Sequence, residues 1–275
     1  MRSLLTKVAG ALVILASVIL PLSAASSQTM DAVKERGSLR VGVTQAPPWF
    51  YKDPAGTEWT GLGASMGKDM AKKLGVEFDP VEVTWGTAVA ALQANKIDVM
   101  FVLDATPERA KAINFPKSPL LYYSLAVLVD DDLTVENWSD LDSSEIKLAV
   151  TQGTSMDTYV TKQLKNAEIL RFPSNGESVA AFQSGRVNAV SLFHPPLIAM
   201  RKQIGRGQIV VPAPAYQAQS SAGVRKEEDS QFVDFVDESI AEYYNSGTSQ
   251  KWYEEFLTSF DVDPSSVPAI EKVAE

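Results

Sequence analysis

Residues 97–110, IDVMFVLDATPERA, indicate the architecture of this chain more clearly than any other stretch. The first half, residues 97–103, is an almost continuous apolar run, as in a strand that is buried on both faces. Thr106 and Pro107 then supply an N-cap and a first helical position. A buried strand that runs directly into a helix is the repeating unit of a parallel sheet covered by helices, so the stretch predicts an α/β fold.

The same alternation of strand and helix continues on both sides. Further strands are predicted at residues 39–43, 120–129, 146–151, 168–172, 187–192 and 208–211. Further helices are predicted at residues 64–74, 85–95, 155–164, 177–184, 195–203, 231–245 and 250–260. Strands separated in this way by helices form parallel sheets, and such sheets bind ligands at the carboxyl ends of their strands.

Two lobes joined by strands would accommodate this alternation. With 275 residues, the chain is long enough for two lobes of ordinary size. It contains neither a repeat nor a low-complexity linker, so the connections between lobes are expected to be strands. Residues 121–127 and 218–224 are the candidates. Two such crossings make a hinge, and lobes on a hinge can close around a ligand.

The N-terminal segment has the pattern of a secretory signal peptide. Arg2 and Lys7 give it positive charge, residues 8–20 are apolar or small, and Ala24 and Ala25 suit a cleavage site. We therefore expect residues 1–25 to be removed on export, and the alternative is an uncleaved membrane anchor. No later segment of the sequence is long and apolar enough to cross a membrane.

Composition excludes several classes of protein and of site. The chain is 45% hydrophobic and 21% charged, as globular proteins are, which excludes a disordered or fibrous chain. It has no cysteine, which excludes disulfides, thiolate metal sites, cysteine nucleophiles and a lipid-carrying cysteine. The net charge is -9, and an acidic chain does not follow phosphate backbones, so we expect no nucleic acid partner.

Arg109 lies where its charge is electrostatically unfavourable. It belongs to the first turn of a predicted helix, directly after a strand, and a cation there opposes the helix dipole. An external anion would explain the position, because a guanidinium binds a carboxylate through two hydrogen bonds. The alternative is a surface arginine that pairs with Asp104 or Glu108.

A second turn from strand to helix, residues 151–155, could also bind an anion. Gly153 lets the backbone approach a ligand closely, and Thr154 or Ser155 caps the helix. The free N–H groups at such a helix start form an anion site. The alternative is an ordinary helix cap without a ligand.

Aromatic residues and a single histidine complete the candidates. Trp49 and Trp85 could stack on a ligand or pack in the core or at its rim. His194 follows a strand end, where a loop or helix-start role competes with ligand contact. One histidine without cysteine does not favour a metal site. Neither a nucleophile elbow nor a dinucleotide fingerprint occurs, so we expect no cofactor.

An ordered series of short motifs makes the chain resemble a known family, the family 3 solute-binding proteins of polar amino acid transporters. In chain order the motifs are GSLRVGV (37–43), PPWF (47–50), LQANKID (92–98), TPERA (106–110), INF (113–115), YY (122–123), QGT (152–154) and GRVNA (185–189). The TPERA motif is the most specific of them. The resemblance extends over residues 30–260, nearly the whole exported chain.

The resemblance implies the type II periplasmic-binding-protein fold, with two doubly wound lobes joined by two hinge strands. We expect lobe 1 to comprise residues 30–124 and 219–260, lobe 2 to comprise residues 125–218, and residues 261–275 to form a C-terminal tail. A ligand captured in the cleft would be handed to membrane permease subunits.

The resemblance also implies roles for individual residues. Arg109 would bind the α-carboxylate of the ligand, assisted by Thr106 and by the helix start at residues 153–155. Trp85 would pack on the ligand side chain.

The half of the site that binds the ammonium group departs from the family. The ammonium-binding aspartate of the family corresponds to Phe193, and residues 61–65 lack both acids of another family segment. Asp104, in turn, stands where the family usually has a serine. Two hypotheses follow. Either Asp104 receives a displaced ammonium group, or the ligand has no α-amino group and rests on Phe193.

These observations predict an exported, monomeric protein of the periplasm that is not an enzyme. It would capture an amino acid or a related small carboxylate for an ABC importer. Two alternatives are a cyclohexadienyl-type dehydratase of the periplasm and a sensor module that presents its ligand to a membrane receptor. Turnover of prephenate or arogenate would favour the first, and neighbouring permease and ATPase genes would favour transport over the second.

Overall fold

The computed structural model describes residues 28–270, apart from the side chains of residues 202, 203 and 266. The expected signal peptide, residues 1–25, and the end of the expected tail, residues 271–275, lie outside the described residues. None of the helices within residues 28–270 has the length and apolar character that a membrane span requires.

Strands and helices alternate along the described chain, which confirms the predicted α/β class. The strands are β1 (Ser38–Val43), β2 (Tyr51–Lys52), β3 (Trp59–Thr60), β4 (Glu77–Glu82), β5 (Val99–Asp104), β6 (Ile113–Asn114), β7 (Leu121–Val129), β8 (Lys147–Thr151), β9 (Glu168–Phe172), β10 (Ala189–Phe193), β11 (Gln208–Val210) and β12 (Gln217–Arg225). The α-helices are α1 (Thr29–Arg36), α2 (Leu62–Leu74), α3 (Ala88–Gln93), α4 (Pro107–Ala112), α5 (Ser155–Gln163), α6 (Asn175–Gln183), α7 (His194–Ile204), α8 (Gln231–Asn245) and α9 (Thr248–Ser259). Two 3-10 turns are η1 (Trp138–Leu141) and η2 (Pro264–Ser266).

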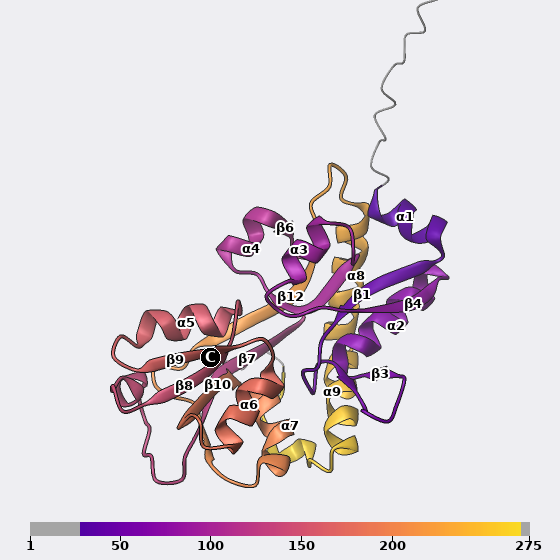
Figure 1. Ribbon diagram of the computed structural model, residues 1–275. Coiled ribbons are helices and arrows are strands. Elements are labelled where there is room, and N and C mark those ends of the chain that lie inside the picture. The colour runs from indigo at the N-terminus through magenta and orange to yellow at the C-terminus, as the bar shows by residue number, and fades with distance from the viewer. Residues whose placement is uncertain (1–27, 271–275) are drawn as a thin grey trace, which may run out of the picture.

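The larger sheet consists of two parallel groups joined by an antiparallel pair. Its strand order is β4-β1-β5-β12-β7-β10-β8-β9. Strands β4, β1 and β5 are parallel, as are β10, β8 and β9, and between them β12 pairs antiparallel with β7. Helices α2 and α3 pack on the first group and α5, α6 and α7 on the second, so two α/β lobes lie side by side (Figure 1). We propose residues 30–124 and 219–260 as lobe 1 and residues 125–218 as lobe 2.

Strands β7 and β12 connect the two lobes. Residues 121–124 of β7 pair with β12, whereas residues 125–129 pair with β10 of the second group. In β12, residues 217–220 pair with β7 and residues 220–224 pair with β5 of the first group. Each of the two predicted hinge segments is therefore a strand that pairs with one parallel group, β12 with the first and β7 with the second, and the two strands pair with each other between the groups.

The last described residues pack against the hinge. The Tyr122 N–H of β7 donates to the carbonyl of Ile270 at 2.9 Å, and the Ile270 N–H donates to the Gln250 side chain at 3.1 Å. Ile270 is buried. Residues 261–270, which we expected to be part of a tail, thus extend from α9 to β7.

A buried carboxylate fixes the start of β5. Asp98 is 1% exposed and accepts hydrogen bonds from the backbone N–H and the guanidinium of Arg40, both at 2.7 Å, and from Arg36. The Asp98 N–H donates to the Arg40 carbonyl at 2.8 Å. These bonds join β5, the strand that ends at Asp104, to β1 and α1.

Gly61 and Gly63 allow the loop that carries Trp49 to pack on the start of α2. Gly61 has a φ of +99°, and a Cβ at this position would lie 2.7 Å from the carbonyl oxygens of Pro48 and Trp49. The N–H groups of Leu62 and Gly63 donate to the same two carbonyls at 3.1 and 2.9 Å. Because only glycine has no Cβ, this close approach of backbone to backbone requires it.

Candidate binding site between the lobes

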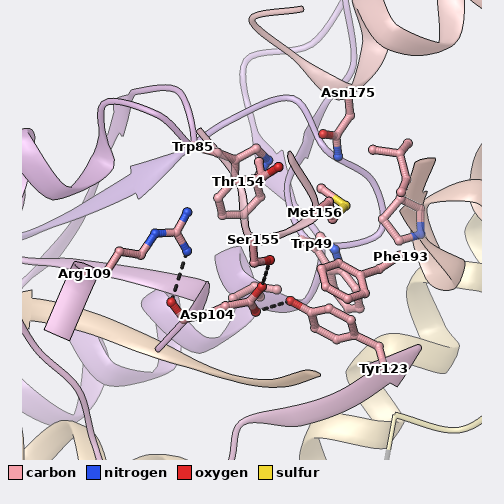
Figure 2. A pocket seen from close by; sticks show the side chains of 13 residues that line it. Trp49, Trp85, Asp104, Arg109, Tyr123, Thr154, Ser155, Met156, Asn175 and Phe193 are labelled. Atoms are coloured by element: carbon pink, nitrogen blue, oxygen red, sulfur yellow. Dashed lines mark hydrogen bonds between the residues drawn. The ribbon is translucent and has the colours of Figure 1, made fainter. Parts of the chain in front are cut away.

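A cavity lies between the lobes, at the carboxyl ends of strands from both of them. Residues from distant parts of the chain line it, namely Trp49, Trp85, Val102, Asp104, Arg109, Tyr123, Thr154, Ser155, Met156, Asn175, Leu192, Phe193 and Pro196. Figure 2 shows Arg109 at one end, Asp104 next to it, and Trp49, Tyr123 and Phe193 together at the other end. The position agrees with the rule that open α/β sheets bind ligands beyond the carboxyl ends of their strands.

The guanidinium of Arg109 bridges the two lobes. Nη1 donates to the backbone carbonyl of Asp104 and Nη2 to that of Gly153, both at 3.1 Å. The backbone N–H of Arg109 donates to the Thr106 hydroxyl at 3.3 Å, so Thr106 is the N-cap of α4. Among the described residues no carboxylate pairs with the guanidinium, so the alternative ion pair with Asp104 or Glu108 does not form. The remaining N–H groups of the guanidinium can serve a ligand.

The turn between β8 and α5 faces Arg109 from the second lobe. The Thr154 hydroxyl caps α5, since it accepts a hydrogen bond from the Asp157 N–H at 3.2 Å and donates to the Thr151 carbonyl at 2.7 Å. Gly153 has a φ of +73°, and its N–H donates to the Asp157 carboxylate at 3.2 Å. The other N–H groups of the first turn lack an intrahelical acceptor, and the helix dipole adds positive potential there. The turn therefore has the geometry expected of an anion site.

Asp104 is the acidic residue that lines the cavity, and the hydrogen bonds of its carboxylate connect both lobes. It ends β5 and is 7% exposed. Its Oδ1 accepts a hydrogen bond from the Tyr123 hydroxyl, and its Oδ2 accepts one from the Ser155 hydroxyl of the second lobe. Burial raises the pKa of Asp104, although the bonds from Ser155 and Tyr123 and the charge of Arg109 oppose this shift. The Ser155 bond closes the cavity across the lobes.

Aromatic rings cover much of the remaining wall. The ring centroids of Tyr123 and Phe193 are 3.8 Å apart in an edge-to-face arrangement, and Trp49 lies 5.9 Å from Tyr123. Trp85 stands closer to Arg109 (Figure 2) and packs on Phe50 at 6.2 Å. The cavity thus has a charged end at Arg109 and Asp104 and an aromatic end at Trp49, Tyr123 and Phe193.

Most of the candidate site residues come together here. Those that line the cavity are Trp49, Trp85, Asp104, Arg109, Thr154, Ser155 and Phe193. Thr106 and Gly153 do not line it but hold Arg109 through the bonds given above. The lining residues that the sequence did not indicate are Val102, Tyr123, Met156, Asn175, Leu192 and Pro196. Asn175 could have been found, because it begins α6 just after the end of β9, as the other strand-end candidates do.

His194 is the one candidate that the structure places elsewhere. It is the first residue of α7 and follows Phe193, the last residue of β10. Successive side chains of extended backbone point to opposite sides, so that of Phe193 reaches the cavity while that of His194 lines a separate hollow with Tyr122. Its Nδ1 lies 3.2 Å from the Ser124 backbone nitrogen, and burial lowers its pKa. Of the roles that the sequence left open for His194, the structure thus shows the helix start, and the side chain lies outside the cavity lining.

Without added ligand, Asp104→Asn is expected to be more stable than the wild type, and increasingly so as the pH rises. Because folding raises the pKa of Asp104 above 3.8, the folded state binds the proton more tightly, and ionisation costs stability above that pH. This cost is absent below the pKa that Asp104 has in the unfolded chain, and it grows until the pH passes the pKa that Asp104 has in the folded protein. The other titratable groups that face this position are the same in the variant and the wild type, namely Arg109, Tyr123 and Tyr216. Urea unfolding between about pH 4 and pH 8 measures the difference, and a difference independent of pH would contradict the burial effect.

Comparison with known proteins identifies a family whose model matches most of the chain. The model of the bacterial extracellular solute-binding proteins, family 3, matches residues 39–259. The L-cystine-binding protein TcyJ of Escherichia coli (strain K12) is 25% identical over 239 residues, which cover 84% of this chain and 88% of that protein.

Solved structures share the architecture. The ancestral amino acid-binding protein AncCDT-1, a precursor of cyclohexadienyl dehydratase, is 29% identical with a TM-score of 0.75, and the match covers 83% of this chain and 99% of that chain. A solute receptor for L-cysteine of Neisseria gonorrhoeae is 26% identical with a TM-score of 0.77, over 87% of this chain and 98% of that chain. The predicted two-lobed type II fold is confirmed by these likenesses.

Proposed function

Because the chain belongs to the bacterial extracellular solute-binding proteins of family 3, we propose that it captures an amino acid or a related small carboxylate and delivers it to an ABC importer. The names of the similar proteins, which refer to L-cystine, amino acids and L-cysteine, support this class of cargo. We place the protein in the periplasm as a monomer, with the permease subunits of the importer as its membrane partner.

One observation carries the proposal, namely the guanidinium of Arg109 in the cavity between the lobes. It has no carboxylate partner among the described residues, and it faces the start of α5 on the opposite lobe. A ligand carboxylate between them would accept charge-assisted hydrogen bonds from both sides. We assign the carboxylate to Arg109 and to the helix start at residues 153–155, with Thr106 as a positioning residue.

The same arrangement explains how a ligand would close the lobes. A ligand shifts an equilibrium only through contacts that differ between the two states. A carboxylate held by Arg109 of lobe 1 and by the backbone N–H groups at the start of α5 in lobe 2 makes both contacts only in the closed form. The bonds from Arg109 to Gly153 and from Ser155 to Asp104 add to the stability of that form.

The aromatic residues would enclose the rest of the ligand. Trp85 stands above the charged end, and Trp49 and Phe193 form the far wall (Figure 2). Their rings exclude water, which strengthens the electrostatic interactions inside the cavity. We propose Trp49, Trp85 and Phe193 as contacts of the ligand body.

Thermal unfolding of the purified protein against a panel of metabolites tests the proposal. The panel contains amino acids, opines, betaines, ectoines and aromatic acids. A ligand at about a hundredfold over its dissociation constant stabilises the folded state by about 2.7 kcal/mol, which raises the melting temperature measurably. We expect at least one compound with a carboxylate to do so. If no compound of this panel stabilises the protein, the proposed carboxylate cargo is contradicted.

We propose that the protein binds its ligand without converting it, because its relatives are named as binding proteins. Incubation with prephenate and arogenate checks this directly, since product formation would establish the dehydratase alternative instead. Transport is proposed over sensing, and uptake of the stabilising ligand by cells with and without the gene distinguishes the two. Uptake that is unchanged by deletion would favour the sensor.

A further inference from the structure

We propose that the cargo is an amino acid with an uncharged, mainly apolar side chain, and that Asp104 binds its α-ammonium group. The inference rests on the proposed function, because it concerns the same cavity and takes Arg109 as the carboxylate anchor.

The charges that line the cavity match a zwitterion. Among the described lining residues, Arg109 is the one cation and Asp104 the one acid. An amino acid with an uncharged side chain brings one charge of each sign and so pairs both residues. A cargo with a charged side chain would bring a third charge for which no described lining residue offers a partner. Burial of an unpaired charge is strongly unfavourable, so the cavity selects against such a cargo.

The two charged residues are also neighbours, as the geometry of an α-amino acid requires. Nη1 of Arg109 lies 3.1 Å from the backbone carbonyl of Asp104, and Figure 2 shows the Asp104 carboxylate on the far side of its own backbone carbonyl, turned toward Ser155 and Tyr123. The carboxylate and ammonium groups of an amino acid are attached to one carbon atom. A cargo anchored by Arg109 therefore presents its ammonium group within reach of Asp104.

Asp104 has the capacity to accept that group. No described cation lies within ion-pair distance of its carboxylate, which accepts hydrogen bonds from the hydroxyls of Tyr123 and Ser155. A carboxylate offers about four acceptor positions, so both hydroxyls can stay in place while an ammonium group adds its donors. An ammonium group would thus add a counter-charge closer to this buried acid than the guanidinium of Arg109, whose charge already acts on it.

Beyond Asp104, the wall offers an apolar surface to the side chain of the cargo. Trp49, Met156, Leu192, Phe193 and Pro196 line this end. A polar side chain at this end is Asn175, whose amide oxygen accepts a hydrogen bond from the Thr151 hydroxyl at 2.7 Å, so its NH2 group can serve one acceptor of the cargo. Burial of apolar surface against the rest of this wall is favourable, whereas a strongly polar side chain would lose its hydration for few partners.

Isothermal titration of the purified protein with matched ligands tests the inference. The probes are L-methionine, L-leucine and L-phenylalanine, the acids that lack only their α-amino group, and L-lysine and L-glutamate. We expect the apolar amino acids to bind most tightly and the loss of the amino group to weaken binding about ten- to a hundredfold. Tightest binding of lysine or glutamate would overturn the assigned side-chain class. Tighter binding of an N-trimethylated derivative, which has no N–H, would overturn hydrogen bonding to Asp104.

Asp104→Asn isolates the role of the carboxylate. We expect this variant to bind the apolar amino acids about ten- to a hundredfold more weakly, while the acids without the amino group bind as to the wild type. Asp130→Asn, which removes an acid paired with Arg206 away from the cavity, serves as the matched control and should change neither affinity. Unchanged amino acid binding by Asp104→Asn would overturn the inference, yet the proposed function would stand if binding still required Arg109. Absence of binding by every amino acid and carboxylate would instead contradict the proposed function itself.

Discussion

Arg109→Ala is expected to weaken binding of the cargo by about a hundredfold or more and so to remove its thermal shift. Within the described part of the chain the guanidinium donates to two backbone carbonyls, so it keeps N–H groups for a carboxylate. Loss of one partner of a desolvated charge pair costs about 2–5 kcal/mol, which corresponds to roughly thirty- to several thousandfold in affinity. Isothermal titration with the best ligand of the panel measures the change.

Two further variants separate anchoring from general damage. Arg109→Lys retains the charge but not the forked pair of donors, so we expect an affinity between those of the wild type and Arg109→Ala. Arg186→Ala removes an arginine that packs on Phe172 outside the cavity and should bind as the wild type does. A full-sized thermal shift in Arg109→Ala would show that the carboxylate is held elsewhere.

The features of the site that local sequence encodes could be predicted. Thr106 and Thr154 cap their helices because a short hydroxyl side chain satisfies an N–H group of the first helical turn. Both caps follow directly on buried strands, and the ends of parallel strands meet at one edge of a sheet. This rule alone predicts that Arg109 and Ser155 lie near a common cavity.

Contacts between distant segments could not be predicted in the same way. Ser155 meets Asp104 only because the second lobe closes on the first, and no local pattern encodes the extent of closure. Local sequence did not indicate Tyr123 as a lining residue and left two kinds of role open for His194, because the side chains of neighbouring residues in a strand alternate between its two faces. Tyr123 points to the cavity and Tyr122 away from it, and the same alternation separates Phe193 from His194.

Strand β4 escaped prediction because it forms an edge of the sheet. Its sequence, EFDPVE, contains acidic residues and Pro80, which depress any strand prediction based on propensity. An edge strand tolerates both, because one side of its backbone has no partner strand and charged residues there prevent unwanted pairing. Its residues are only partly buried, so it also lacks the continuous apolar run that identified β5.

Asp98→Ala is expected to lower the free energy of unfolding by about 2–4 kcal/mol. The carboxylate is 1% exposed and joins the start of β5 to Arg36 and Arg40. Removal of one partner of a fully buried ion pair costs about 3–5 kcal/mol, and we expect somewhat less here because both arginines are partly exposed to water. Urea unfolding measures the change, and an unaltered dependence on urea concentration would show that folding remains two-state.

Glu58→Ala is the matched control for Asp98→Ala. Glu58 pairs with Lys68 at 3.3 Å, but its side chain is 78% exposed, so solvent screens the interaction and we expect a change within about 0.5 kcal/mol. The contrast tests whether burial, rather than the ion pair as such, makes Asp98 important. Because β5 ends at Asp104 and leads into Arg109, loosening of its start should also weaken ligand binding, in proportion to the population that unfolds locally. Equal stability of the two variants would mean that the Asp98 network contributes no more than a surface pair and does not fix the strand that carries the site.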